Sequence, residues 1–154
     1  MNELFMRKAI RIASESVMNG GGPFGAVIVK DGEIIAESAN SVTQDNDSTA
    51  HAEINAIRQA CFKLGTFDLT GCDIYTSCEP CPMCLGAIYW ARISHIYYGN
   101  SRKDAANINF ADDYIYEEIG KSPNNRNLPI IQMLRDEAQE TLRLWMEKTD
   151  KIEY

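Results

Sequence analysis

Two short motifs that carry metal-binding side chains constrain this chain most, because both must reach the same place in the folded protein. Residues 49–53 read TAHAE and residues 79–84 read EPCPMC, and each motif precedes an apolar pattern with helical spacing. Residues three apart at a helix start face the same side, so the thiols of Cys81 and Cys84 can bind one metal ion. The prolines of the second motif suit a helix entry, where a missing amide proton costs little. The fold must therefore bring two helix N-termini together.

The order of the expected elements predicts the fold class. Two apolar runs, 27–29 and 34–36, flank Asp31-Gly32, which is typical of a tight hairpin between two strands. Apolar periodicity and stop signals predict the remaining elements, which are helices over 5–17, 52–64, 85–90 and 134–146 and strands over 73–77 and 93–98. Strands that alternate with helices after a hairpin indicate an α/β protein: a three-layer α/β/α sandwich with a mixed central sheet.

Length and charge narrow the kind of substrate. The chain has 154 residues, the usual size of one domain, and a formal net charge of -7. A negative charge opposes broad attraction to phosphate backbones, so a small or neutral substrate is favoured over nucleic acid. Arg92, Arg102 and Lys103 lie close in sequence, so a local basic strip stays open as an alternative.

Cysteine usage and the first residues point to the cytosol. Arg7, Lys8 and Arg11 interrupt the apolar run of residues 4–17, so we expect neither a signal peptide nor a membrane-spanning helix, and no membrane partner. Five cysteines without a secretory signal, three of them between residues 78 and 84, favour metal binding over disulfides. We expect a cytoplasmic protein.

The candidate ligands predict a catalytic zinc site. Two thiolates and an imidazole, from Cys81, Cys84 and His51, suit zinc, and iron is the alternative. Three protein ligands leave one tetrahedral position open, which distinguishes a catalytic zinc from a structural one. Glu53 then serves as the proton carrier beside the metal. The competing hypothesis is a structural zinc with Cys78 as the fourth ligand, which would leave Glu53 without a purpose.

The motif pair H-x-E and P-C-x-x-C resembles the signature of zinc-dependent nucleobase deaminases in the cytidine deaminase superfamily. The chain looks most like the small bacterial guanine deaminases, and the similarity runs nearly end to end. It is carried by GGPFGA at 21–26, TAHAE at 49–53, TSCEPCPMCLGAIYWAR at 76–92, the stretch 110–116 and the terminal Glu153-Tyr154. The first three passages are general to the superfamily, and the last two indicate guanine.

This resemblance implies an assembly and a set of substrate contacts. It implies one zinc ion per subunit and a homodimer of single-domain chains that exchange a C-terminal segment, about 121–154. It implies contacts to the base from five side chains, with Phe24, Asn40 and Trp90 lining the pocket, Asp112 reading polar edges of the purine and Tyr154 closing the site of the partner subunit. Asp113, beside Asp112, is the alternative pocket carboxylate.

Three functions compete at this point. The first is hydrolytic deamination of free guanine to xanthine and ammonia, a step of purine salvage or catabolism. The second uses the same motifs on another substrate, either adenosine in transfer RNA or cytosine. The third is a non-catalytic zinc module for dimerisation, which Glu53 argues against because such a module needs no proton carrier.

Overall fold

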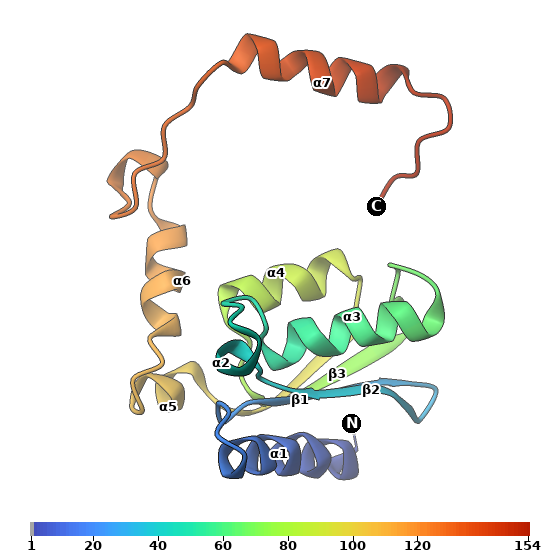
Figure 1. Ribbon diagram of the computed structural model, residues 1–154, viewed down its shortest axis with the longest axis vertical. Helices are drawn as coiled ribbons and strands as arrows, with labels where there is room; N and C mark the ends of the chain where they lie inside the picture. The colour runs from blue at the N-terminus through green and yellow to red at the C-terminus, as the bar shows by residue number, and fades with distance from the viewer. Residues whose placement is uncertain (1) are drawn as a thin grey trace. The chain divides into compact units, whose positions relative to one another are not determined.

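A four-stranded sheet in the order β2-β1-β3-β4 organises the first part of the chain (Figure 1). The computed structural model describes residues 2–154, and contacts divide them into two units with the boundary between Tyr116 and Glu117. The strands are β1 (Gly25–Lys30), β2 (Glu33–Ala39), β3 (Cys72–Cys78) and β4 (His95–Asn100). The helices of the first unit are α1 (Glu3–Met18), α2 (Val42–Asp45), α3 (Ala52–Leu64), α4 (Pro82–Trp90), α5 (Arg102–Ala106) and the start of α6 (Asp112–Gly120).

The sheet is mixed, as predicted. β1 pairs with β2 and with β3 in the antiparallel direction, whereas β3 and β4, joined through α4, are parallel. The hairpin turns at Asp31 and Gly32, whose φ angles of 50° and 81° are both positive. The Asp-Gly pair tolerates positive φ angles, and the turn that they form has the same twist as the flanking strands. The sequence signal for the hairpin is thus confirmed.

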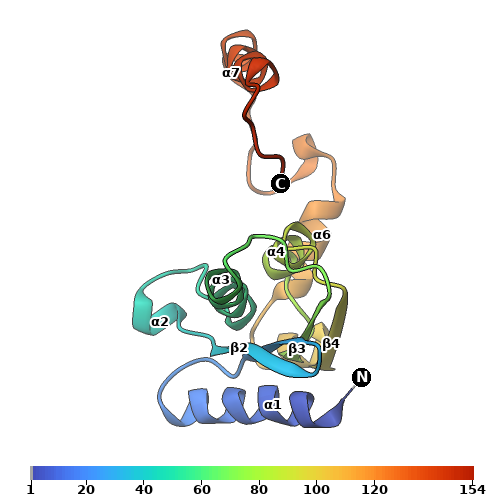
Figure 2. The ribbon, with the colours of Figure 1, turned by 90° about the vertical axis from the view of Figure 1, so that its right-hand side faces the viewer.

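Helices cover both faces of the sheet, which confirms the three-layer α/β/α sandwich. Figure 2 shows α1 on one side and α3 and α4 on the other. Side chains alternate along β1, so Ala26 and Ile28 join the core under α3 and α4 while Val27 packs toward α1. A Cβ at Gly25 would lie only 2.4 Å from the Ala9 carbonyl oxygen of α1. Glycine therefore lets this helix sit directly on the start of β1.

Some elements differ from the prediction for local reasons. The last strand begins at His95 instead of residue 93, because Arg92 adopts a positive φ of 57° in the turn after α4. The short helices α2 and α5 contain too few residues to show apolar periodicity. The start of α5 is instead fixed by a capping box between Ser101 and Asp104.

The second unit, residues 117–154, contains the end of α6, a 3-10 turn at Pro123–Asn125 and α7 (Arg135–Glu147). α7 matches the predicted C-terminal helix. The boundary between the units falls within α6, and α6 ends at Gly120, just before the expected start of the C-terminal segment at about residue 121. Among residues 2–154, no helix is both long enough and apolar enough to cross a membrane.

A buried serine gives a test of how the strands are joined. The amide of Gly25 donates to Ser77 Oγ at 3.0 Å inside the molecule, so Ser77→Ala leaves that amide without a partner. We expect a loss of about 1–3 kcal/mol in the free energy of unfolding, measured by urea denaturation of zinc-loaded protein. The control is Ser14→Ala on the exposed face of α1, where Ser14 Oγ donates to the Ile10 carbonyl and the change should stay within about 0.5 kcal/mol. Equal stability of the two variants would contradict this account.

Candidate metal centre and active site

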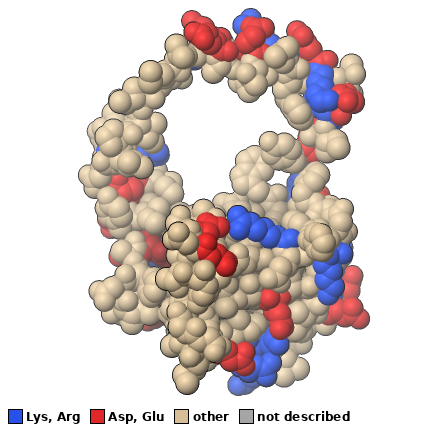
Figure 3. Space-filling view, in the orientation of Figure 1, with Lys and Arg blue, Asp and Glu red and all other residues tan. Residues whose placement is uncertain are grey.

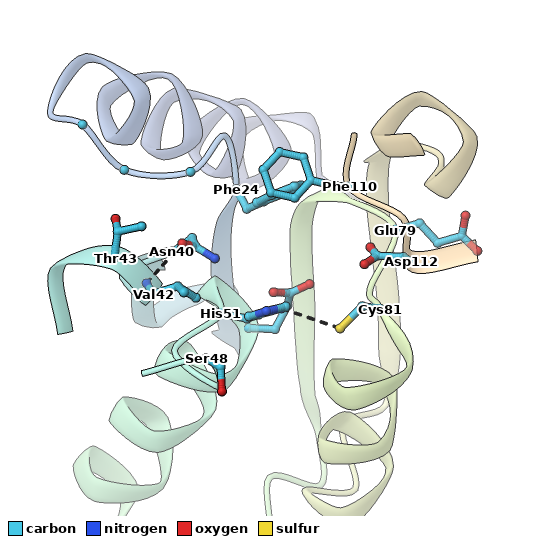
Figure 4. Close-up of a pocket in the computed structure, with 14 residues that line it drawn as sticks. Phe24, Asn40, Val42, Thr43, Ser48, His51, Glu79, Cys81, Phe110 and Asp112 are labelled. Carbon is cyan, nitrogen blue, oxygen red and sulfur yellow. Dashed lines mark hydrogen bonds between the residues drawn. The ribbon is translucent and has the colours of Figure 1, made fainter. Parts of the chain in front are cut away.

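The first ligand lies where α3 begins. His51 is the N-cap of this helix, with an extended backbone (φ -70°, ψ 154°), and Glu53 lies in the first helical turn. The extended cap lets His51 turn back while Glu53 leans over the same site, which side chains two apart within a helix do not do. Figure 4 shows His51 and Cys81 facing each other at the floor of a cavity.

The two cysteines lie at the start of α4. Cys81 is its N-cap, and the amide of Cys84 donates to Cys81 Sγ at 3.5 Å. Pro82 occupies the first turn, as predicted for a helix entry. Both sulfurs lie close to His51 Nδ1, at 3.6 Å for Cys81 and 3.5 Å for Cys84. The structure therefore brings the three predicted ligands together.

These separations fit a tetrahedral zinc ion. The ligand atoms of His51, Cys81 and Cys84 all lie within 4.8 Å of one another. Zinc bonds of about 2.3 Å to sulfur and about 2.0 Å to nitrogen, at a tetrahedral angle, place a sulfur and a nitrogen about 3.5 Å apart. The donor chemistry and the spacing agree, so these side chains can hold the metal without rearrangement.

Cys78 does not belong to this group. Its Sγ donates to the Ser101 carbonyl at 3.7 Å, and burial raises the pKa of its thiol to about 11. Within residues 2–154, the cluster that could hold a metal contains His51, Cys81 and Cys84 alone. The geometry thus favours a site with an open fourth position over a closed structural site.

The ionisable groups of the site are strongly perturbed. Hydrogen bonds from the Cys84 thiol and from His51 lower the pKa of Cys81 to about 4, which favours the thiolate form of this sulfur. The neighbouring thiolate and burial raise the pKa of Cys84. Burial raises the pKa of Glu53 to about 7, which suits a group that must both take and give a proton near neutral pH.

A cavity of about 360 Å³ lies above these residues, within the usual range of small-molecule sites. His51, Glu53 and Cys81 form part of its lining, together with the predicted contacts Phe24, Asn40 and Asp112. In Figure 4, Asn40 and Asp112 lie on opposite sides, with Phe24 above the metal ligands. The cavity is thus lined by an apolar wall, by two polar side chains and by the candidate metal site.

Asn40 is held in a defined orientation. Its Oδ1 accepts a hydrogen bond from the Val42 amide at 3.2 Å, so its amide nitrogen is turned toward the side of the cavity where His51 lies (Figure 4). A Cβ at Gly22 would come within 3.2 Å of the same Oδ1. The glycine before Pro23 therefore leaves room for the Asn40 side chain.

One predicted contact is not brought to this cavity within one chain. Trp90 is the last residue of α4 and is 68% exposed, whereas Cys81, at the other end of that helix, lines the cavity. Nine residues of helix separate these ends by about 13 Å. Tyr154 belongs to the second unit. The roles of Trp90 and Tyr154 stay predictions.

Two residues that line the cavity were not predicted from the sequence. Phe110 packs edge-to-face on Phe24, with ring centroids 4.8 Å apart, and completes the apolar wall. Glu79 also lines the cavity, while its Oε2 accepts from the amide of Arg102 at 2.9 Å. Both residues lie in stretches that carried the resemblance, but their contacts depend on tertiary packing that no local pattern reveals.

Comparison with known proteins agrees with this geometry. Residues 1–100 match the family described as "Cytidine and deoxycytidylate deaminase zinc-binding region". This chain belongs to that family of zinc-binding deaminases, so the predicted superfamily is confirmed.

Within the family, the chain is 51% identical to the guanine deaminase of Bacillus subtilis (strain 168), over 99% of both proteins. An X-ray structure of guanine deaminase from Bacillus subtilis matches with a TM-score of 0.96 and covers 100% of this chain and 99% of that one. A tRNA-specific adenosine deaminase of Aquifex aeolicus (strain VF5) is 45% identical, but over only 62% of this chain and 64% of that protein. The predicted resemblance to bacterial guanine deaminases is confirmed.

The metal site predicts a clear difference between two cysteines. Cys84→Ser replaces a thiolate ligand with a hydroxyl. Replacing a residue that only supports a ligand lowers metal affinity by up to about 100-fold, so we expect loss of the ligand itself to lower zinc affinity by more than about 100-fold. Zinc content after dialysis against a competing chelator measures this loss. Cys61→Ser is the control, because Cys61 lies outside the ligand cluster and should leave zinc binding unchanged. Full zinc retention by Cys84→Ser would refute the assignment.

Proposed function

We propose that this protein catalyses the zinc-dependent hydrolytic deamination of free guanine to xanthine and ammonia, in purine salvage or catabolism. The observation that carries the proposal is the 51% identity to a guanine deaminase over 99% of both chains. The cavity supports it, because it combines an open metal site, a buried carboxyl group and polar groups on opposite walls.

Each residue of the site has a proposed role in that reaction. His51, Cys81 and Cys84 would hold one zinc ion per subunit, which would supply a Lewis acid that lowers the pKa of water. Glu53 takes a proton from the attacking water, delivers it to a ring nitrogen and later protonates the departing ammonia. The bond from the ring carbon to the exocyclic nitrogen breaks, and the oxygen of water takes that position.

The base would be held by the walls of the cavity. Phe24, backed by Phe110, offers an apolar face for the flat purine, and the Asn40 amide and Asp112 carboxylate offer polar contacts to its edges. Burial raises the pKa of Asp112, as expected for a carboxyl group that faces a partly closed cavity. Asp113 is exposed and outside the lining, which supports Asp112 as the pocket carboxylate.

The proposal includes the assembly and location expected from the sequence. We propose a cytoplasmic homodimer in which a C-terminal segment is exchanged and Tyr154 closes the partner's site. Nucleic acid is not among the proposed partners. On the face that Figure 3 shows, basic side chains are interspersed with acidic ones and do not merge into a basic surface.

Adenosine deamination in transfer RNA is the second candidate, favoured by the 45% identity to a tRNA-specific adenosine deaminase. That similarity spans 96 residues, whereas the similarity to guanine deaminase spans 154. The net charge of -7 also opposes the phosphate contacts on which RNA affinity depends.

A substrate panel tests the choice between these functions. Zinc-loaded protein is offered guanine, adenine, cytosine, cytidine and an anticodon stem-loop RNA, and ammonia release is measured. We expect release from guanine alone, because the motifs outside the shared zinc region match guanine deaminases. Release from the RNA would favour the second candidate. No release from any of the five would favour the non-catalytic zinc module.

Glu53→Gln separates chemistry from metal binding. The amide keeps the size of the side chain but cannot carry the proton, so we expect kcat on guanine to fall at least about 100-fold with zinc content unchanged. Glu37→Gln is the matched control, because Glu37 is exposed on β2 and pairs with Lys8. Retained turnover in Glu53→Gln would overturn the proposed mechanism, and loss of zinc would show that Glu53 supports coordination.

A further inference from the structure

The segment that carries Cys81 is attached to the elements that follow β4. The Glu79 amide donates to the Asn100 carbonyl at 2.8 Å, and Glu79 Oε2 accepts from the Arg102 amide at 2.9 Å. The Arg102 guanidinium in turn lies 4.6 Å from the centre of the Tyr116 ring. The loop before α4 is therefore linked to the start of α5 and to α6.

Tyr116 makes the direct connection between α6 and this segment. Its hydroxyl donates to the Pro80 carbonyl at 2.9 Å, immediately before the metal ligand Cys81. The ring is held by the cation–π contact with Arg102, which in this setting contributes a modest attraction. Tyr116 thus joins the helix that begins at Asp112 to the loop that delivers Cys81.

The position of Tyr116 on α6 makes this connection relevant to Asp112. Residues four apart on a helix lie on the same face, so Asp112, which lines the cavity, and Tyr116, which reaches Pro80, share one side of α6. Between residues 112 and 116 only these two are half-buried, and the three between them are exposed. No residue of α6 is fully buried. The orientation of its first turn therefore depends on specific contacts, of which the Tyr116 hydrogen bond is one.

We propose that Tyr116 is a positioning residue for substrate recognition, which holds the Asp112 carboxylate at the cavity wall opposite Asn40. This inference rests on the proposed function, because it assigns Asp112 to the polar edge of the purine. Tyr116 does not itself line the cavity. It acts through the helix turn that separates it from Asp112, while the Arg102 guanidinium restricts the tilt of its ring.

If Tyr116 positions Asp112, its substitution should weaken substrate binding and leave the chemical step nearly unchanged. Tyr116→Phe removes the hydroxyl and keeps the ring, so Asp112 loses a restraint while His51, Glu53 and both cysteine ligands are unaltered. We expect the KM for guanine to rise roughly three- to tenfold, the range that one hydrogen bond supplies, while kcat changes less than about threefold. Zinc content should equal that of the wild-type protein.

A matched control comes from another tyrosine that makes one main-chain hydrogen bond. Tyr75 Oη accepts from the Asn2 amide at 3.1 Å on the side of the sheet covered by α1. Tyr75→Phe makes the same chemical change away from the cavity, and we expect its KM and kcat to match the wild type. A similar rise in KM in both variants would show a general loss of packing and would overturn the proposal.

A double-mutant cycle tests whether Tyr116 acts through Asp112. Asp112→Asn, Tyr116→Phe and the double variant are compared by kcat/KM on guanine. If the path runs through Asp112, Tyr116→Phe should change kcat/KM less than about twofold once Asp112 is replaced, because coupled residues are not additive. Fully additive losses would overturn the inference, and so would a fall in zinc content or in kcat alone for Tyr116→Phe. A wild-type protein inactive on guanine would instead refute the proposed function.

Discussion

The convergence of three donor atoms from two helix starts is the constraint on which the rest of the site depends. His51 and Cys81 are both N-caps with extended backbones, and Cys84 lies one turn further along α4. Helix N-termini carry partial positive charge, which favours thiolates and negative charge in the cavity. The sheet sets the distance between α3 and α4, since both pack on the face that contains Ala26, Ile28 and Ile74. The core therefore holds the ligands at metal-binding separations.

Hydrogen bonding and burial give the ionisable groups of the site very different pKa values. Hydrogen bonds from its neighbours lower the pKa of Cys81 to about 4, whereas burial of Glu53, which has almost no exposed surface, raises its pKa to about 7. Two acidic side chains of one site thus differ in ionisation: the pKa of Cys81 lies well below neutral pH, and that of Glu53 lies near it. This separation of pKa values is a physical signature of acid–base catalysis.

The sequence predicted the features that depend on residues close together in the chain. The candidate ligands could be predicted because each motif combines a helix-entry pattern with soft donor atoms, and the structure brings them together; the hairpin could be predicted because Asp31-Gly32 suits two positive φ angles. Phe110, Glu79 and Tyr116 were not assigned roles, because their contacts join segments far apart in sequence. Trp90 was expected at the base from similarity, but the length of α4 separates it from the cavity in the same chain. The candidate metal ligands were therefore easier to predict than the residues that line the cavity around them.

The hydrogen bond from the Cys84 amide to Cys81 Sγ has a consequence for reactivity. Two thiolates give a bound metal much electron density, which weakens its pull on a fourth ligand. A main-chain N–H directed at one sulfur withdraws part of that density, and the aligned dipoles of α4 act in the same sense. The helix start that positions the ligand also limits how strongly the ligand donates. The backbone of α4 would thereby help a zinc ion held by these ligands to keep the electrophilic character that hydrolysis requires.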